Sequence, residues 1–260
     1  MNKTRFMYWS SVALGALPFP GKRRYFVLGH PKSGTSWTFQ LLSEYLDLPR
    51  LKPSKRYWPC LGSCVIKAHR FLPGESVRKR TIYVVRDGRD IVISHYMSLV
   101  RGNPRNRAAI EASLGEELAA DRIRNHLPAF LSYCQNNKRA SIPYRDHVFH
   151  AVDREYSMIR YEDLLENSEE TFGKAVETLL GRPADYDRIR QVLHDNDFKT
   201  RTGRARGVEA QGVFMRKGIA GDWRNHFDRE AAQIFDDYAG DVLVKFGYEP
   251  DRDWVQSIAA

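Results

Sequence analysis

Four short apolar runs, each ending abruptly in polar residues, form the clearest pattern along the chain. They cover residues 25–28, 64–66, 81–85 and 156–159. Short apolar runs bounded by polar or turn-forming residues are typical of buried strands. Apolar residues at helical spacing fill the intervals, and strands that alternate with helices predict a parallel sheet. We therefore expect an α/β fold in which a central parallel sheet is flanked by helices on both faces.

Four segments have the apolar spacing of amphipathic helices. They are residues 35–45, 90–99, 171–180 and 228–246. Asn167 and Glu170 form a pattern like a capping box at the start of the third segment, and Gly181 is expected to end it. Asp228 and Gly247 bracket the fourth segment.

The first predicted strand leads into the turn Gly29-His-Pro-Lys-Ser-Gly34 and then into a helix. Backbone N–H groups at a helix N-terminus lack internal partners and carry partial positive charge, so such a turn suits an anionic ligand group. Lys32 adds a full positive charge. The pattern predicts a phosphate-binding turn in a single P-loop-like domain, and an ordinary strand-to-helix connection is the alternative.

This turn differs from the nucleotide-hydrolase form, G-x-x-x-x-G-K-[ST], because its only lysine precedes the glycine. Magnesium-dependent triphosphate chemistry is therefore disfavoured, and we expect no metal site. A P-loop kinase that transfers phosphate from ATP is one rival function. It would need a Mg²⁺-binding hydroxyl after the lysine and an acidic partner at a strand end, and neither is clear.

Polar residues follow each predicted strand, among them Lys32, His69, Arg86 and Tyr161. Ligands of open parallel sheets bind outside the carboxyl ends of the strands, so these four side chains would converge on one crevice if the strands are neighbours. Histidine titrates close to neutrality, which makes His69 a candidate general base. A core or capping histidine is the alternative.

Two basic segments follow later in the chain. Arg216-Lys-Gly-Ile-Ala-Gly-Asp-Trp223 combines two cations with two glycines, which allow a phosphate to approach the backbone closely. Residues 199–206 carry Lys199, Arg201, Arg204 and Arg206 among Thr and Gly, and we interpret them as a mobile basic loop. A solvated charge run is an equally good interpretation of that loop.

The net charge of +9 suits a polyanionic ligand, and it would also suit nucleic acid or an acidic membrane surface. A basic nucleic-acid-binding protein is therefore the second rival function, although no recognisable DNA- or RNA-binding module is present. We expect no nucleic-acid partner. Cys60, Cys64 and Cys134 are too few for a disulfide framework and have no zinc spacing, so we expect thiols in a reducing compartment and a cytoplasmic protein.

The 260 residues suit one large domain, which we place at residues 21–260. Residues 1–20 contain Lys3 and Arg5 followed by a mildly apolar run that polar residues, glycine and proline interrupt. A disordered leader or a segment in peripheral contact with a membrane fits this pattern better than a cleaved signal peptide.

Together these segments resemble the cytosolic-type sulfotransferases, which move a sulfuryl group from 3′-phosphoadenosine 5′-phosphosulfate (PAPS) to an acceptor hydroxyl or amine and release 3′-phosphoadenosine 5′-phosphate (PAP). Pro31-Lys-Ser-Gly-Thr-Ser-Trp37 is similar to the family's 5′-phosphosulfate loop, and Lys67-Ala-His69 to the Lys-Thr-His stretch of its catalytic base. Arg86 with Ser94 matches its 3′-phosphate pair, and residues 216–223 match its C-terminal signature. The motifs occur in the family's order.

The resemblance implies a role for each matching residue. Lys32 would bind the 5′-phosphosulfate and stabilise charge on the leaving oxygen, and His69 and Lys67 would join it as catalytic residues. The remaining loop contacts would come from Ser33, Gly34, Thr35 and Ser36. Trp37, Tyr161 and Phe198 would form the nucleotide pocket, and the 3′-phosphate would be held by Arg86, Ser94, Arg216, Lys217 and Gly218.

The chain departs from the family pattern in three places. Asn196, near Phe198, stands where the family usually has Thr, and the C-terminal pattern breaks at Asp228. The family's Lys-Thr-Val-Glu dimer stretch is not evident, so the oligomeric state is unknown.

The acceptor is not defined by these motifs. Residues 101–150 are polar and rich in Arg, Asn and His, and we expect an irregular excursion over the sheet edge that holds the acceptor. Aromatic and polar residues at 49–62 and 100–155 allow a small-molecule, lipid or glycan acceptor.

Overall fold

The computed structural model describes residues 23–51, 62–102, 104–136, 143–210 and 215–258. The chain divides into two compact units. We call Met1–Val85 with Ala151–Arg204 the sheet unit, and Arg86–His150 with Ala205–Ala260 the helical unit. The predicted leader at residues 1–20 lies outside the described residues, and the single domain at residues 21–260 stays a prediction.

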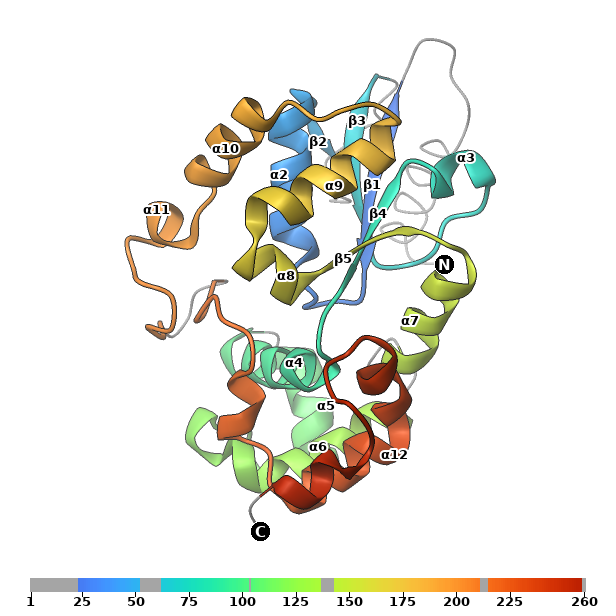
Figure 1. The fold of residues 1–260 in the computed structure, drawn as a ribbon. Coiled ribbons are helices and arrows are strands. Elements are labelled where there is room, and N and C mark those ends of the chain that lie inside the picture. Colours follow the sequence, from blue (N-terminus) through green and yellow to red (C-terminus); the bar gives the residue numbers. More distant parts are fainter. Residues whose placement is uncertain (1–22, 52–61, 103, 137–142, 211–214, 259–260) are drawn as a thin grey trace. The chain divides into compact units, whose positions relative to one another are not determined.

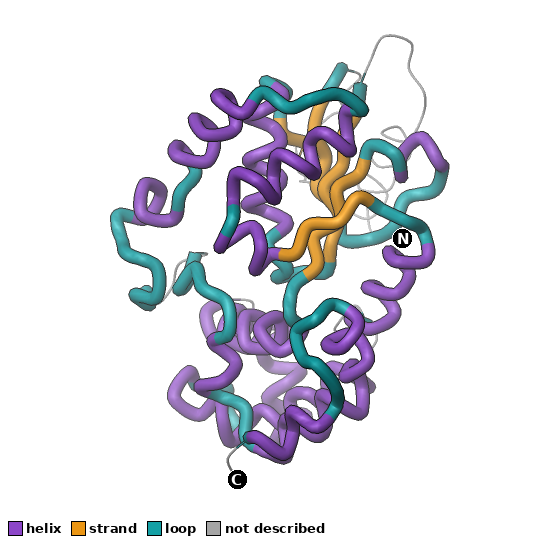
Figure 2. The backbone as a smooth tube through the Cα atoms, viewed as in Figure 1, coloured by secondary structure: helices purple, strands orange, loops and turns teal. Residues whose placement is uncertain are grey.

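Within the described residues, the sheet unit contains five parallel strands in the order β2-β3-β1-β4-β5 (Figures 1 and 2). They are β1 (Arg24–Gly29), β2 (Arg50–Leu51), β3 (Cys64–Ala68), β4 (Thr81–Val85) and β5 (Ser157–Arg160). The four predicted strands and their parallel pairing are confirmed. The sequence pattern missed β2, because two residues are too few to show periodicity.

Alternate strand residues face opposite sides of the sheet, as the pleat requires. Val27, Val65 and Ile82 belong to one core cluster. Helices α2 (Thr35–Leu46), α9 (Ser168–Leu180) and α10 (Tyr186–Asp195) lie on that side of the strands (Figure 1). The neighbouring strand residues Phe26 and Ile66 pack with Val77 of α3 (Glu75–Arg78) on the other side. The predicted α/β fold with helices on both faces is confirmed.

Two shorter helices complete the sheet unit, α8 (Tyr161–Glu166) and α11 (Phe198–Thr202). The basic segment at 199–206 is therefore partly helical, and its prediction as a loop is wrong for residues 199–202. Asn167 occupies the N-cap of α9 as predicted, but its side chain makes no capping hydrogen bond, and Glu170 pairs with Lys174 instead of reaching back.

The described residues of the helical unit form five helices and short 3₁₀ turns. The helices are α4 (Gly88–Gly102), α5 (Pro104–Leu114), α6 (Ile123–Asn136), α7 (Tyr144–Asp153, whose last turn belongs to the sheet unit) and α12 (Arg229–Lys245). The turns are η1 (Ala120–Arg122), η2 (Asp222–Asn225) and η3 (Asp253–Ser257). Asp228 caps α12 by accepting a hydrogen bond from the Ala231 N–H.

The expectation of an irregular stretch at 101–150 is wrong, because α5, α6 and most of α7 lie there. In α6, Ile123, Leu127, Phe130 and Leu131 are buried at the spacing of one helix face. The Arg, Asn and His content of the stretch obscured this pattern.

No helix in the described residues is long and apolar enough to cross a membrane. Cys64 and Cys134 are free thiols, whereas Cys60 lies outside the described residues.

Candidate active site

The turn between β1 and α2 has the strand–turn–helix geometry that its sequence predicts. Lys32 and Gly34 both adopt positive φ angles, 75° and 95°. The Ser33 N–H donates to the His30 carbonyl at 3.1 Å, which closes the turn. Gly34 is the N-cap of α2, so the first N–H groups of the helix point into the turn without a side-chain cap.

Two glycines allow neighbouring groups to approach the turn closely. A Cβ at Gly29 would lie 2.6 Å from the Val84 carbonyl oxygen and 2.7 Å from Ser33 Oγ. A Cβ at Gly34 would lie 2.4 Å from the ring of Tyr161. The turn is therefore packed between the end of β4 and the first residue of α8.

Two hydroxyl groups near the turn are buried without a hydrogen-bond partner among the described residues. They are Ser33 Oγ and Thr38 Oγ1, and both side chains are inaccessible to solvent. A buried hydroxyl without a partner is costly, and native structures rarely contain one. Ser33 lies in the turn itself, so a ligand oxygen there would satisfy it.

A second lysine reaches the same helix end from the adjacent strand. Lys67 Nζ of β3 donates to Ser36 Oγ in the first turn of α2 at 2.9 Å. Lys67 lies beside Val27 of β1 in the parallel register, on the side of the sheet that carries α2. Lys67 therefore adds its charge to the positive end of the helix dipole, where an anion is stabilised.

His69 follows β3 and bonds to the start of the turn. Its Nδ1 lies 2.8 Å from the Gly29 carbonyl oxygen. A carbonyl oxygen only accepts, so Nδ1 carries the proton and Nε2 keeps a lone pair. The pKa of His69 is lowered to about 4, mainly by burial and further by the charges of Lys67 and Lys32. The hydrogen bond to Gly29 opposes this decrease. The imidazole is thus neutral at pH 7, with Nε2 unprotonated.

Aromatic side chains extend this group. Trp37 meets Tyr161 edge to face, with ring centroids 6.3 Å apart, and is half-buried against the core beneath α2. Phe198 is buried at the start of α11, and the Arg204 guanidinium lies 5.2 Å from its ring centroid. All three rings therefore contribute to packing, whatever ligand they contact.

Asn196, where the chain departs from the family pattern, is buried in a hydrogen-bond network. Its Nδ2 donates to Glu44 of α2 and to the Val192 carbonyl, and its Oδ1 accepts from Arg201 at 3.0 Å. The amide both donates and accepts, which a threonine hydroxyl would do with fewer bonds. Asn196 thereby ties the end of α10 to α2 and α11.

In the helical unit, Arg86 is tied to the late glycine-rich segment. Its Nη2 donates to Asp90 Oδ2 and to the Ile219 carbonyl, each at 3.3 Å. Asp90 also accepts from the backbone N–H groups of Gly221, at 2.8 Å, and Trp223, at 3.0 Å. Burial raises the pKa of Asp90, and Arg86 and these two N–H groups oppose that rise.

Sequence reasoning missed Asp90. It is buried in the first turn of α4, four positions after Arg86, which precedes the helix, and its carboxylate pairs with the Arg86 guanidinium. The signal in the sequence was a carboxylate four positions after Arg86, close enough to pair with it. It joins the Arg86 segment to residues 219–223 of the glycine-rich segment.

Arg216 and Lys217 share a buried carboxylate. Both donate to Asp222, Lys217 Nζ at 2.7 Å. Burial would raise the pKa of Asp222, but the hydrogen bonds from Arg216 and Lys217 and the nearby His226 outweigh it and hold that pKa well below its usual range. Gly218 and Gly221 take positive φ angles, 66° and 78°, as expected for residues that turn the backbone tightly.

The predicted site residues thus form two groups. In the sheet unit the contacts join the turn of Lys32 and Ser33 to Lys67, His69 and Tyr161. In the helical unit Arg86 contacts Ile219, next to Gly218, and Ser94 lies half-buried on α4. The convergence of both groups on one crevice stays a prediction. No cluster of His, Cys, Asp or Glu in the described residues could hold a metal ion.

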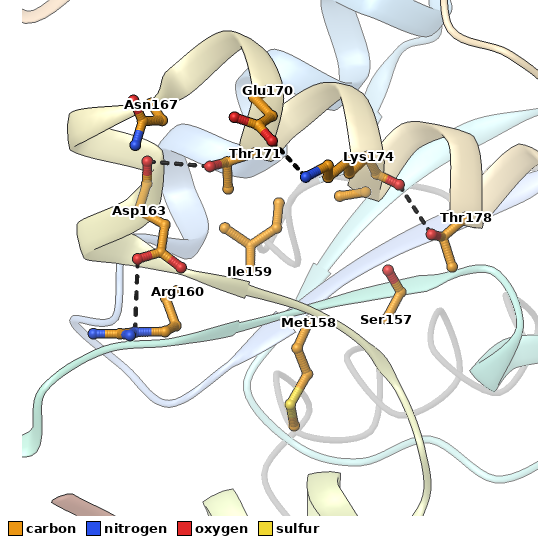
Figure 3. A pocket seen from close by; sticks show the side chains of 11 residues that line it. Ser157, Met158, Ile159, Arg160, Asp163, Asn167, Glu170, Thr171, Lys174 and Thr178 are labelled. Carbon is orange, nitrogen blue, oxygen red and sulfur yellow. Dashed lines mark hydrogen bonds and ion pairs between the residues drawn. The ribbon is translucent and has the colours of Figure 1, made fainter. Parts of the chain in front are cut away.

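A groove beside β5 lies apart from these groups. It has a volume of about 560 Å³ and is lined by β5, Asp163 and one side of α9 (Figure 3). Its charged side chains are already paired, Arg160 with Asp163 and Lys174 with Glu170 (Figure 3). None of the predicted site residues lines it.

Comparisons with known proteins agree with the motifs. A family model described as "Sulfotransferase domain" matches residues 65–247. Sulfotransferase 1E1 of Mus musculus is 24% identical to this chain, and the match covers 96% of this chain and 93% of the mouse protein. The amine sulfotransferase of Oryctolagus cuniculus is 24% identical, with coverage of 81% and 77%.

Solved structures share the fold. Mouse sulfotransferase SULT7A1, solved with PAP, is 19% identical with a TM-score of 0.62, and the match covers 93% of this chain and 95% of the other. Retinol dehydratase, solved with androsterone and PAP, is 18% identical with a TM-score of 0.60 and coverage of 92% and 85%.

We expect Gly34→Ala to destabilise the protein through both its positive φ angle and the ring of Tyr161. Urea unfolding should show a loss of about 2 kcal/mol or more. Gly115→Ala is the matched control, because Gly115 also has a positive φ, 73°, but open space around it, and should lose only about 1 kcal/mol. Equal losses would mean that Tyr161 yields to the added methyl group.

Asp90→Asn should also destabilise the protein, because it removes the charge between Arg86 and two backbone donors but keeps the shape. The free energy of unfolding, measured in urea, should fall by about 2 kcal/mol, which is the typical contribution of a hydrogen bond to a charged group. The exposed Asp121→Asn provides a control with the same change in charge. Unchanged stability of Asp90→Asn would show that a neutral amide holds the glycine-rich segment equally well.

Proposed function

Since the chain belongs to the sulfotransferase family, we propose that it transfers the sulfuryl group by in-line displacement, with His69 as the general base. As a sulfotransferase it is an enzyme that takes the sulfuryl group from PAPS, leaves PAP and acts on small-molecule acceptors. The observation that carries the proposal is the tautomer of His69, whose Nδ1–H donates to Gly29 and leaves Nε2 unprotonated.

His69 Nε2 accepts the proton of the acceptor hydroxyl or amine as the acceptor atom attacks sulfur. The new bond to sulfur forms while the bond from sulfur to the 5′-phosphate oxygen breaks. Lys32, Lys67 and the N–H groups at the start of α2 stabilise the negative charge that develops on that oxygen. Such preorganised donors do most of the work in transfers of this kind, which need little covalent help from the protein.

We further propose how the donor is bound. Ser33 Oγ donates to a 5′-phosphosulfate oxygen and thereby gains the partner that it lacks among the described residues, and Gly34, Thr35 and Ser36 complete the loop. Trp37, Tyr161 and Phe198 contact the adenine. The 3′-phosphate is bound by Arg86, Ser94, Arg216, Lys217 and Gly218.

The rival functions have less support. The family match favours neither a kinase nor a nucleic-acid-binding protein. The acceptor class, membrane contact through the N-terminus and a cytoplasmic location stay predictions.

His69→Ala should lower kcat by about 10²–10⁴-fold, because it removes the general base. PAP affinity, measured by calorimetry in EDTA, should change little. The exposed His194→Ala serves as the control. Full turnover in His69→Ala would exclude His69 as the base, and a requirement for Mg²⁺ with ATP would favour the kinase.

The pH profile should report the lowered pKa of His69. The base form persists below neutrality, so kcat/KM for PAPS should stay level down to about pH 5 and fall as His69 protonates near its pKa of about 4. Lys67→Met removes a neighbouring cation and should move this acid limb to higher pH. An acid limb near the ordinary histidine value in both proteins would contradict the assignment.

A further inference from the structure

The two cations proposed to bind the 3′-phosphate already contact two carboxylates. Asp222 accepts from both Arg216 and Lys217. Glu209 lies on the other side of the pair, with its Oε1 3.2 Å from Arg216 Nη1 and its Oε2 3.5 Å from Lys217 Nζ. The side chains of Arg216 and Lys217 are only 12% and 18% exposed.

The formal charges of this cluster cancel. Arg86, Arg216 and Lys217 are positive, whereas Asp90, Asp222 and Glu209 are negative. His226 lies 3.6 Å from Asp222 and adds no charge while it is neutral. A phosphate monoester carries about −1.5 to −2 charge at pH 7, so a neutral cluster attracts it weakly. One carboxylate has to leave the cations before they can bind a phosphate fully.

Asp90 and Asp222 are poorly suited to leave. Their side chains are 1% and 3% exposed, and each accepts from further donors: Asp90 from the Gly221 and Trp223 N–H groups, Asp222 from Asn225. Moving either carboxylate away from the cations would leave a buried charge and buried hydrogen-bond donors without partners, which costs free energy.

Glu209 is suited to leave. Its side chain is 36% exposed, and its contacts to Arg216 and Lys217 are longer than the 2.7 Å contact of Lys217 with Asp222. A partly exposed pair of this kind is weak, and water can solvate the released carboxylate.

We propose that Glu209 is a stand-in anion, which occupies Arg216 and Lys217 in the empty enzyme and is displaced by the 3′-phosphate. This inference rests on the proposed function of Arg216 and Lys217. Glu209 weakens the binding of 3′-phosphorylated nucleotides, because each binding event breaks its contacts, and it speeds the release of PAP by returning to the cations. A nucleotide without a 3′-phosphate does not displace Glu209.

The test is calorimetric titration of wild type and Glu209→Gln with PAP and with adenosine 5′-monophosphate (AMP), which lacks the 3′-phosphate. Glu209→Gln should bind PAP about five- to tenfold more tightly and AMP with unchanged affinity. Glu117→Gln, exposed and in the helical unit, is the control for the loss of one negative charge. Glu209→Asp, which keeps the charge on a shorter side chain, should lie between wild type and Glu209→Gln.

Unchanged or weaker PAP binding by Glu209→Gln would overturn the inference, because Glu209 would then be neutral or would position the two cations. If Glu117→Gln gained as much affinity for PAP, or if Glu209→Gln gained as much affinity for AMP, the effect would come from net charge alone. Either result would also overturn the inference. Arg216→Ala separates this from the proposed function. If wild type binds PAP and Arg216→Ala does not, Arg216 is part of the 3′-phosphate site, independently of the result for Glu209. If both proteins bind PAP equally well, Arg216 is not part of that site.

Discussion

The close approach of the strand ends at Gly29 is the constraint on which the candidate active site depends. Gly29 lies at the end of the central strand β1, where a side chain would meet the Val84 carbonyl of β4 and the Ser33 hydroxyl of the turn. Its own carbonyl accepts from His69, which follows β3. One glycine therefore joins the neighbouring strand on either side to the turn between β1 and α2 and orients the proposed base.

The cations proposed to bind the 3′-phosphate are held by buried carboxylates. Arg86 is held by Asp90, and Arg216 and Lys217 by Asp222. Such pairs fix the direction of long side chains that would otherwise lose rotamer freedom on binding a ligand. The +9 net charge of the chain therefore says little about any single site, because the cations most relevant to a phosphate are already partly neutralised.

In the turn the charge is arranged differently. Lys67 donates to a neutral hydroxyl, that of Ser36, at the start of α2. The same charge lowers the pKa of His69 together with burial. An anionic donor would offset that effect, so the basicity of His69 is coupled to occupation of the turn.

The sequence alone was sufficient for β1, β3, β4 and β5 with their parallel pairing, for helices α2, α4, α9 and α12, and for the motifs of the family, because apolar periodicity and turn residues are local signals. It misled over residues 101–150, where polar composition hid the buried face of α6, and over 199–202, which form a short helix. Only the tertiary structure revealed Asp90, the tautomer of His69 and the contacts of Glu209. The reason is physical: a hydrogen bond between residues far apart in the chain depends on which backbone and side-chain atoms packing brings within 3 Å, and no local pattern records that.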